Sequence, residues 1–194
     1  MKVLILNDHP ASKGAELALL HGLCHGIGAH HEIQWVETHE LDLQACRSCL
    51  KCRPYGECVL PEDDAHRIAR MLFCAGGLVV GLSPAKPDLS DRFHCLLERS
   101  LSALAYPNPA GEICPWRQGR PAVVVTVGGL VETGNAAAAK GIQPALRQLL
   151  DAGGFKVIGG ELETVEGVAG AGLPLMVRAE NLGRLLSADM AFSV

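Results

Sequence analysis

The sequence predicts an α/β fold of the doubly wound type, a five-stranded parallel sheet with strand order 2-1-3-4-5 and helices on both faces. Short β-branched runs alternate with longer segments of helical periodicity along all 194 residues. Most of these runs are apolar throughout, as is typical of strands buried on both faces of a parallel sheet. Five strands favour this order over that of the six-stranded dinucleotide-binding fold.

In the first half of the chain, Lys2–Asn7 (KVLILN) is a continuous apolar run and predicts a buried strand. Gly14–Gly28 has apolar residues at spacings of three and four, which predicts a helix. Glu32–Glu37 alternates between polar and apolar residues and predicts a strand. Ala65–Cys74 predicts the next helix, with Ile68, Met71 and Leu72 on one face, and the apolar Gly76–Leu82 a second buried strand.

In the second half, Asp88–Leu104 predicts a helix whose inner stripe is Leu89, Phe93, Leu96, Leu97 and Leu101. Residues 106–119 are rich in proline and glycine and predict an excursion before the strand Pro121–Val127. Ala136–Ala152 predicts a helix that ends at Gly153-Gly154. The last elements are a strand at Phe155–Ile158 and a helix at Pro174–Met190. We expect residues 1–194 to form a single domain.

Composition excludes several classes of protein. The net charge is −4 and aromatic residues make up 4% of the chain, which argues against nucleic-acid binding. No apolar run approaches the roughly 20 residues that cross a bilayer, and the apolar run at residues 3–6 is shorter than a signal-peptide core of about 7–15 residues. We therefore expect a cytoplasmic protein with no membrane partner.

Four of the eight cysteines form the motif C-x2-C-x2-C-x5-C, at Cys46, Cys49, Cys52 and Cys58. Ferredoxin-type runs share the C-x2-C-x2-C core, whereas zinc sites usually take two C-x2-C pairs farther apart. The spacing favours a [4Fe–4S] cluster over zinc, and four free thiols in a surface loop remain the third possibility. The cations between them, Arg47, Lys51 and Arg53, would offset the charge of the thiolates.

The other cysteines carry less information. Cys24, Cys74 and Cys95 lie on predicted helix faces and are interpreted as small core residues, while Cys114 lies in a loop. Among the eight histidines, His9 follows the first strand, where ligands bind, and a structural role is as plausible there as a functional one. His21 and His25 are spaced to chelate a metal, but no third ligand is evident and a pair at the edge of the core is the favoured interpretation. No side chain stands out as an acid–base catalyst.

Ligands of this fold class bind beyond the carboxyl ends of the strands, here the loops after Asn7, Leu82 and Val127. With CRSCLKCRPYGECVLPEDD at 46–64, GLSP at 81–84 and VTVGG at 125–129, the chain resembles the NADPH-dependent FMN reductase superfamily, and within it the iron–sulfur flavoproteins. The resemblance implies a flavodoxin-like domain that binds FMN at these three loops and a [4Fe–4S] cluster on the four cysteines.

The residues that the resemblance assigns to FMN come from all three loops: His9, Pro10, Ser12, Lys13, Gly14, Ser83, Pro84, Ala85, Lys86, Gly128, Gly129 and Thr133. The resemblance also implies a homodimer or homotetramer and an electron donor such as ferredoxin or NAD(P)H.

The first loop departs from the family pattern, since Asp8 and Glu16 stand where the family has a glycine and a hydroxyl residue. Two carboxylates near a phosphate predict weak FMN binding. The preferred function is electron transfer or NAD(P)H-dependent reduction. The alternative is a flavin-less descendant that acts as a binding protein and carries a cluster or zinc.

Overall fold

The computed structural model describes residues 1–8, 15–82, 89–106, 119–126, 144–158 and 173–192 of the chain. Five parallel strands form one sheet in the order β2-β1-β3-β4-β5, as the sequence predicted. They are β1 (Lys2–Asn7), β2 (Glu32–Glu37), β3 (Gly77–Leu82), β4 (Arg120–Thr126) and β5 (Phe155–Val157). β1 pairs with β2 from Lys2↔Glu32 to Asn7↔Glu37 and with β3 from Val3↔Gly77 to Asn7↔Gly81.

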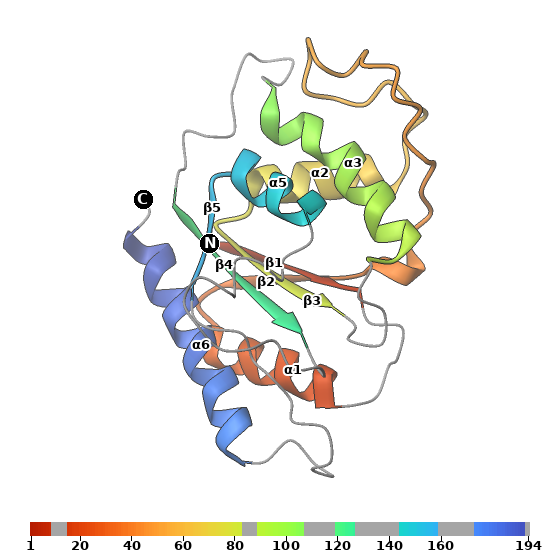
Figure 1. Ribbon diagram of the computed structural model, residues 1–194. Coiled ribbons are helices and arrows are strands. Elements are labelled where there is room, and N and C mark those ends of the chain that lie inside the picture. The colour runs from red at the N-terminus through yellow and green to blue at the C-terminus, as the bar shows by residue number, and fades with distance from the viewer. Residues whose placement is uncertain (9–14, 83–88, 107–118, 127–143, 159–172, 193–194) are drawn as a thin grey trace.

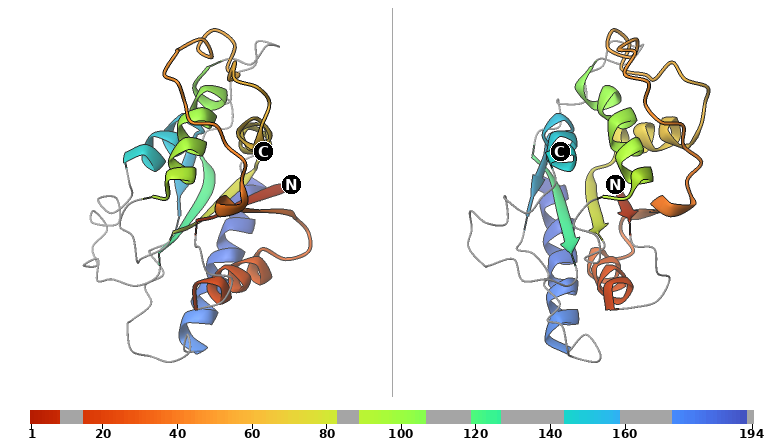
Figure 2. Two further views of the ribbon diagram at one scale, coloured as in Figure 1. Left: turned by 90° about the vertical axis from the view of Figure 1, so that its right-hand side faces the viewer. Right: turned by 45° about the vertical axis from the view of Figure 1, so that its right-hand side comes forward.

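Helices cover both faces of the sheet (Figures 1 and 2). One face carries α1 (Ala15–Ile27) and α6 (Leu173–Phe192), and the other carries α2 (Asp64–Cys74), α3 (Asp91–Ala105) and α5 (Pro144–Ala152). A short 3-10 helix, η1 (Thr38–Glu40), follows β2. None of the helices in the described part of the chain is long and apolar enough to span a membrane.

Side chains of a strand alternate between the two faces, which divides the core into two halves. Val3 and Ile5 of β1 pack with α1 and α6, whereas Leu4 and Leu6 pack with α2, α3 and α5. Both pairs are fully buried, as the continuous apolar run in the sequence indicates. The backbones of α1 and α6 lie very close together. A Cβ atom on Gly26 would be only 2.0 Å from the Glu180 carbonyl oxygen.

Predicted and observed element boundaries differ by up to three residues where both ends are described. The helix predicted from Asp88 begins at Asp91, because the Ser90 hydroxyl accepts a hydrogen bond from the Phe93 N–H at 3.1 Å and caps the helix there. Leu89 is still buried, but it lies ahead of the helix. Helix α5 is described from Pro144 only, so residues 136–143 of the predicted helix lie outside the described residues, as does the excursion at 107–118.

Candidate functional site

The four cysteines of the motif lie on one loop that joins η1 to α2, which we call the cysteine loop (residues 41–63). The loop projects from the side of the sheet that α2 and α3 cover (Figures 1 and 2). Cys49 is exposed, and Cys46, Cys52 and Cys58 are partly buried. The cations between them, Arg47, Lys51 and Arg53, are exposed.

The backbone of this loop turns sharply around its cysteines. Ser48 and Leu50, on either side of Cys49, have φ values of 49° and 58°, in the left-handed region that non-glycine residues rarely adopt. The carbonyl oxygen of Cys52 accepts hydrogen bonds from the N–H groups of Tyr55 and Gly56, at 3.2 and 2.8 Å. Gly56 has a φ of 63°, which suits glycine in a tight turn.

The thiols are close in sequence but do not converge on one point. In the part of the chain that the structure describes, no three His, Cys, Asp or Glu side chains form a group that could hold a metal. One contact has the form expected of a thiolate ligand, since the Ser48 N–H points at the Cys46 Sγ at 3.4 Å. The structure thus places the four predicted ligands on one loop without assembling them into a site.

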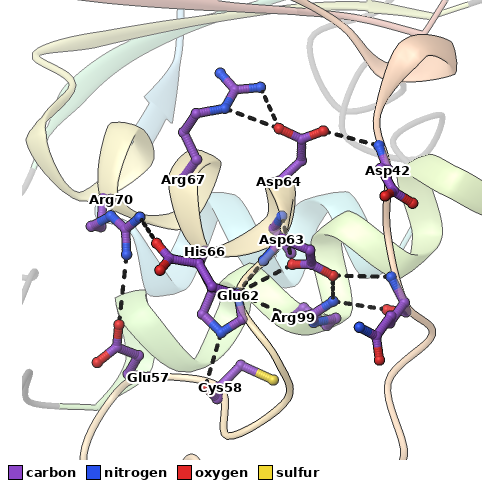
Figure 3. Close-up of polar contacts among 12 residues, drawn as sticks. Asp42, Glu57, Cys58, Glu62, Asp63, Asp64, His66, Arg67, Arg70 and Arg99 are labelled. Carbon is purple, nitrogen blue, oxygen red and sulfur yellow. Dashed lines mark hydrogen bonds and ion pairs between the residues drawn. The ribbon is translucent and has the colours of Figure 1, made fainter.

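Three buried side chains fix both ends of the cysteine loop to the helices, and we call them the clamp: Asp63, His66 and Arg99 (Figure 3). At the first end, Arg99 Nη1 donates to the Gln44 carbonyl oxygen at 3.0 Å, and the Gln44 N–H donates to Asp63 Oδ2 at 3.0 Å. At the other end, His66 Nε2 lies 3.0 Å from the Cys58 carbonyl oxygen. The segment that holds all four cysteines is therefore anchored on each side.

The clamp is held together by its own contacts. Arg99 Nη1 also donates to Asp63 Oδ2, and Arg99 Nη2 lies 3.3 Å from His66 Nδ1. Asp63 caps α2 by accepting from the Ala65 N–H at 3.1 Å, and His66 Nδ1 completes the capping box with the Asp63 N–H at 3.2 Å. The side chains of Arg99, His66 and Asp63 are 0%, 5% and 7% exposed, so water screens these interactions little.

Burial and charge oppose each other in the clamp. Burial acts to raise the pKa of Asp63, but hydrogen bonds from Arg99 and the Gln44 N–H bring that pKa below its ordinary value. Burial likewise acts to lower the pKa of Arg99, while Asp63 and then the Cys58 side chain raise it above the ordinary value. Asp63 is therefore ionised and Arg99 charged at neutral pH.

The surroundings of Cys58 fit a cluster ligand better than those of an ordinary surface thiol. The guanidinium of Arg99 lies next to its side chain, and the buried Nε of Arg99 is without a hydrogen-bond partner among the described residues. A buried N–H without an acceptor is costly, and an ionised sulfur is an acceptor for it. In charge and donor chemistry the site suits an anionic iron–sulfur group.

The sequence did not indicate His66 or Arg99 as site residues. His66 follows Asp63 by three residues, and the capping-box spacing was a signal that could have found it, with histidine in place of glutamate. Arg99 lies among Leu96, Leu97 and Ser100, on the buried face of α3. A charged residue inside an apolar stripe was the available signal for a buried partner.

The described part of the carboxyl edge shows the partners of Asp8. Asp8 does not present a free carboxylate there. Its Oδ1 accepts from the hydroxyls of Thr38 and Ser90, and its Oδ2 accepts from the Ser90 N–H at 3.0 Å. Asp8 is 8% exposed and lies at the N-terminus of α3, where a helix favours negative charge. Asp8 therefore has an internal role at the start of α3, and its predicted effect on a phosphate stays a prediction.

All the residues predicted to bind FMN lie outside the described residues. They are His9, Pro10, Ser12, Lys13, Gly14, Ser83, Pro84, Ala85, Lys86, Gly128, Gly129 and Thr133. The strand ends that precede them are described, and Asn7, Leu82 and Thr126 do end neighbouring strands at one edge of the sheet.

The two histidines at metal-chelating spacing have different partners. The ring of His21 stacks on Trp35 with centroids 5.4 Å apart, while His25 Nδ1 lies 3.1 Å from Glu180 Oε1. The interpretation of the remaining cysteines as core residues is wrong for Cys74, which is exposed near the C-terminus of α2, whereas Cys24 and Cys95 are partly buried. Burial raises the pKa of Cys24 to about 11.

Solved structures share this architecture over nearly the whole chain. An NAD(P)H:quinone oxidoreductase from Methanothermobacter marburgensis matches with a TM-score of 0.67 and 20% identity over 96% of each chain. The fold is flavodoxin-like. A flavodoxin from the domain Archaea matches with a TM-score of 0.56 and 12% identity, over 98% of this chain and 99% of its own.

An NADH:FMN oxidoreductase in its apo form matches with a TM-score of 0.61 and 13% identity, over 96% of this chain and 88% of its own. No protein-family model and no curated protein matches the sequence. At these identities the structural likeness establishes the fold and leaves the function to the chemistry of the site.

Proposed function

We propose that this protein is an NAD(P)H-dependent reductase or electron-transfer protein that carries a [4Fe–4S] cluster on Cys46, Cys49, Cys52 and Cys58 and FMN at the carboxyl edge of the sheet. The observation that carries the proposal is the clamp, which fixes both ends of a four-cysteine loop to a flavodoxin-like domain and places a buried cation beside Cys58.

The residues around the loop support the cluster. The spacing of the thiols matches that of cluster-binding runs, and Arg47, Lys51 and Arg53 supply positive charge between them. The Ser48 N–H and the Arg99 Nε are two donors available to ionised sulfurs. Cluster binding requires the segment between the two clamped ends to draw its four thiols together.

The fold supports the flavin. Similar structures include a flavodoxin and oxidoreductases that use NAD(P)H, and one of them is named for FMN. When bound, FMN would accept a hydride and the cluster would carry one electron at a time. The three loops after Asn7, Leu82 and Thr126 would hold it, and Asp8, bound to Thr38 and Ser90, fixes the base of the first loop against α3.

The position of the cysteine loop supports self-association. It lies beyond α2 and α3, on the far side of these helices from the sheet (Figure 1). Its exposed apolar side chains, Leu50, Tyr55 and Val59, are 52–62% exposed beside exposed cations. A second copy of the chain, in a homodimer or homotetramer, would bring a flavin to this loop, and an acidic electron donor such as a ferredoxin fits the same surface. Both cofactors are consistent with the cytoplasmic location expected from the sequence.

Purification without oxygen tests the proposal. We expect about four iron and four sulfide per chain and up to one FMN, with a mass by light scattering of at least two chains. Cys49→Ser should remove most of the iron because it deletes one of four ligands. Cys74→Ser is the matched control, because Cys74 is also exposed but lies outside the motif, and it should keep the iron.

Other results would change the assignment. Stoichiometric zinc without sulfide would replace the cluster by a zinc site. Flavin without any metal would leave the four thiols free and the reductase without a cluster. A cluster without flavin, even at millimolar FMN, would contradict the reductase and leave a cluster-bearing binding protein.

A further inference from the structure

A cavity of about 420 Å³ lies between α2, α3 and the end of the cysteine loop. Its described lining comes from these three segments and includes none of the residues assigned to FMN. Its volume is within the range of small-molecule sites, roughly 300–1,000 Å³. Neither the proposed cluster nor the proposed flavin accounts for this space.

The cavity wall is mainly apolar, with polar groups near Cys58. Ala69 and Phe73 of α2 and Ala103 of α3 supply apolar surface, while His66 and Arg99 of the clamp also line the cavity. A mainly apolar wall with a few polar groups is typical of sites that bind an apolar body and orient it through one polar end.

Arg99 supplies buried positive charge to the cavity wall. Its side chain is fully buried, its Nη1 and Nη2 have partners, and its Nε has no acceptor among the described residues. Native proteins rarely leave a buried guanidinium N–H without an acceptor, because the loss costs about 1–3 kcal/mol. This N–H is the donor offered above to an ionised Cys58 sulfur, so an anion in the cavity is attracted by the charge of the Arg99 guanidinium and not by this N–H.

The charges on the wall favour an anionic ligand. Arg70 lines the cavity together with Arg99, whereas Glu57 is the one carboxylate among the lining residues that the structure describes. Arg70 is divided between two acids, with Nη1 3.7 Å from Glu57 Oε1 and Nη2 2.7 Å from Glu62 Oε1. Because these pairs are more than half exposed, Arg70 can turn toward a ligand at little cost.

We propose that this cavity binds a small, largely apolar carboxylate, with the carboxylate at Arg99 and Arg70 and the apolar body against Ala69, Phe73 and Ala103. The ligand lies beside Cys58 and therefore next to the cysteine loop. The proposal uses only residues on the described surface of the cavity and no contact with the flavin, while Glu57 and Cys58 of that surface also belong to the cysteine loop.

Binding of benzoate, measured by saturation-transfer NMR and calorimetry on the full chain, tests the proposal. Benzoate has the flat apolar body and the single carboxylate that the cavity requires. We expect saturable binding with a dissociation constant on the order of 1 mM, and binding at least about tenfold weaker for benzyl alcohol, which lacks the charge.

Matched variants locate the binding. Ala103→Leu fills the cavity from α3 and should abolish binding, while Ala105→Leu, at an exposed position of the same helix, should leave it unchanged. Arg70→Gln should weaken benzoate about 3- to 10-fold. Arg67→Gln is its control, because Arg67 is also exposed and pairs with Asp64 on α2 but does not line the cavity. Glu57→Gln should strengthen binding by a similar factor.

Three outcomes would overturn the proposal. The first is no saturable binding of benzoate. The second is binding that Ala103→Leu and Arg70→Gln leave unchanged, which would mean an adventitious additive only. The third is equal binding of benzyl alcohol, which would contradict the carboxylate as the recognised group. Iron and flavin contents are measured on the same samples, so failure here is distinguishable from failure of the proposed function.

Discussion

Two buried arginines, Arg99 and Arg120, show how differently this fold uses a buried cation. Arg120, which starts β4, is 1% exposed and donates to the carbonyl oxygens of Leu72, Ala75 and Gly153 and, at 3.4 Å, Phe73. Its guanidinium also lies 3.9 Å from the centroid of the Phe155 ring. These carbonyls belong to the C-terminal ends of α2 and α5, where helices leave oxygens without partners and favour positive charge.

Arg99 is also buried, but its partners differ in kind. It contacts a carboxylate and an imidazole, in Asp63 and His66, its charge interacts with the Cys58 side chain, and it keeps one N–H without an acceptor among the described residues. Backbone carbonyls neither titrate nor bind metal, whereas all three of these side chains do one or both. The comparison separates a buried cation whose partners can titrate or bind a metal from one whose partners are the ends of helices.

The largest effect that this comparison predicts is on stability at Arg120. Arg120→Met removes the donors from several buried carbonyls at once and should lower the free energy of unfolding by about 3–5 kcal/mol. Urea denaturation followed by tryptophan fluorescence measures this loss. Iron per folded chain should not change, because the cysteine loop makes no contact with Arg120 among those described. A loss below about 1 kcal/mol would contradict the structural role.

Arg99→Met should cost less stability but more function. We expect a loss of about 2–3 kcal/mol in the free energy of unfolding, because Asp63 retains the N–H groups of Gln44 and Ala65. Iron content should fall by half or more, since one end of the cysteine loop is released. Arg67→Met, an exposed residue paired with Asp64, is the control and should change either quantity little. If Arg99→Met retained all of its iron, cluster binding would not require the clamp.

The smallest predicted effect concerns pH. The pKa of Asp63 is lower in the folded chain than its ordinary value of 3.8, so its ion pair stabilises the fold fully above that pH and the contribution is lost as the pH falls through the folded pKa. The free energy of unfolding, measured at each pH, falls as the pH is lowered from 5 to about 2. Asp63→Asn should make this fall smaller by about 1 kcal/mol. Arg120→Met should lower the free energy of unfolding by a similar amount at every pH, so that its dependence on pH is unchanged. A fall of unchanged size in Asp63→Asn would contradict the lowered pKa.

Much of the fold follows from short stretches of sequence. Lys2–Asn7 forms a buried parallel strand, as its continuous apolar run indicates. The alternation of such runs with amphipathic segments predicts a doubly wound sheet, and the number of strands favours the order that the structure has. The grouping of the four cysteines on one loop also follows from the sequence, because all four lie between residues 46 and 58. The start of α3 was predicted less well because the Ser90 cap, and not the apolar stripe, decides where the helix begins.

The contacts between residues far apart in the chain were decided by the tertiary structure alone. Asp8 accepts hydrogen bonds from Thr38 and Ser90, which lie 30 and 82 positions away, and nothing in the sequence indicated these partners. Arg99 meets Asp63 across 36 positions, and the cavity beside them exists only because α2 and α3 pack side by side. Sequence periodicity states which face of an element is buried. Which side chain a buried charge finds is decided by how the elements pack, because a charge is stable in the interior only where its partners converge.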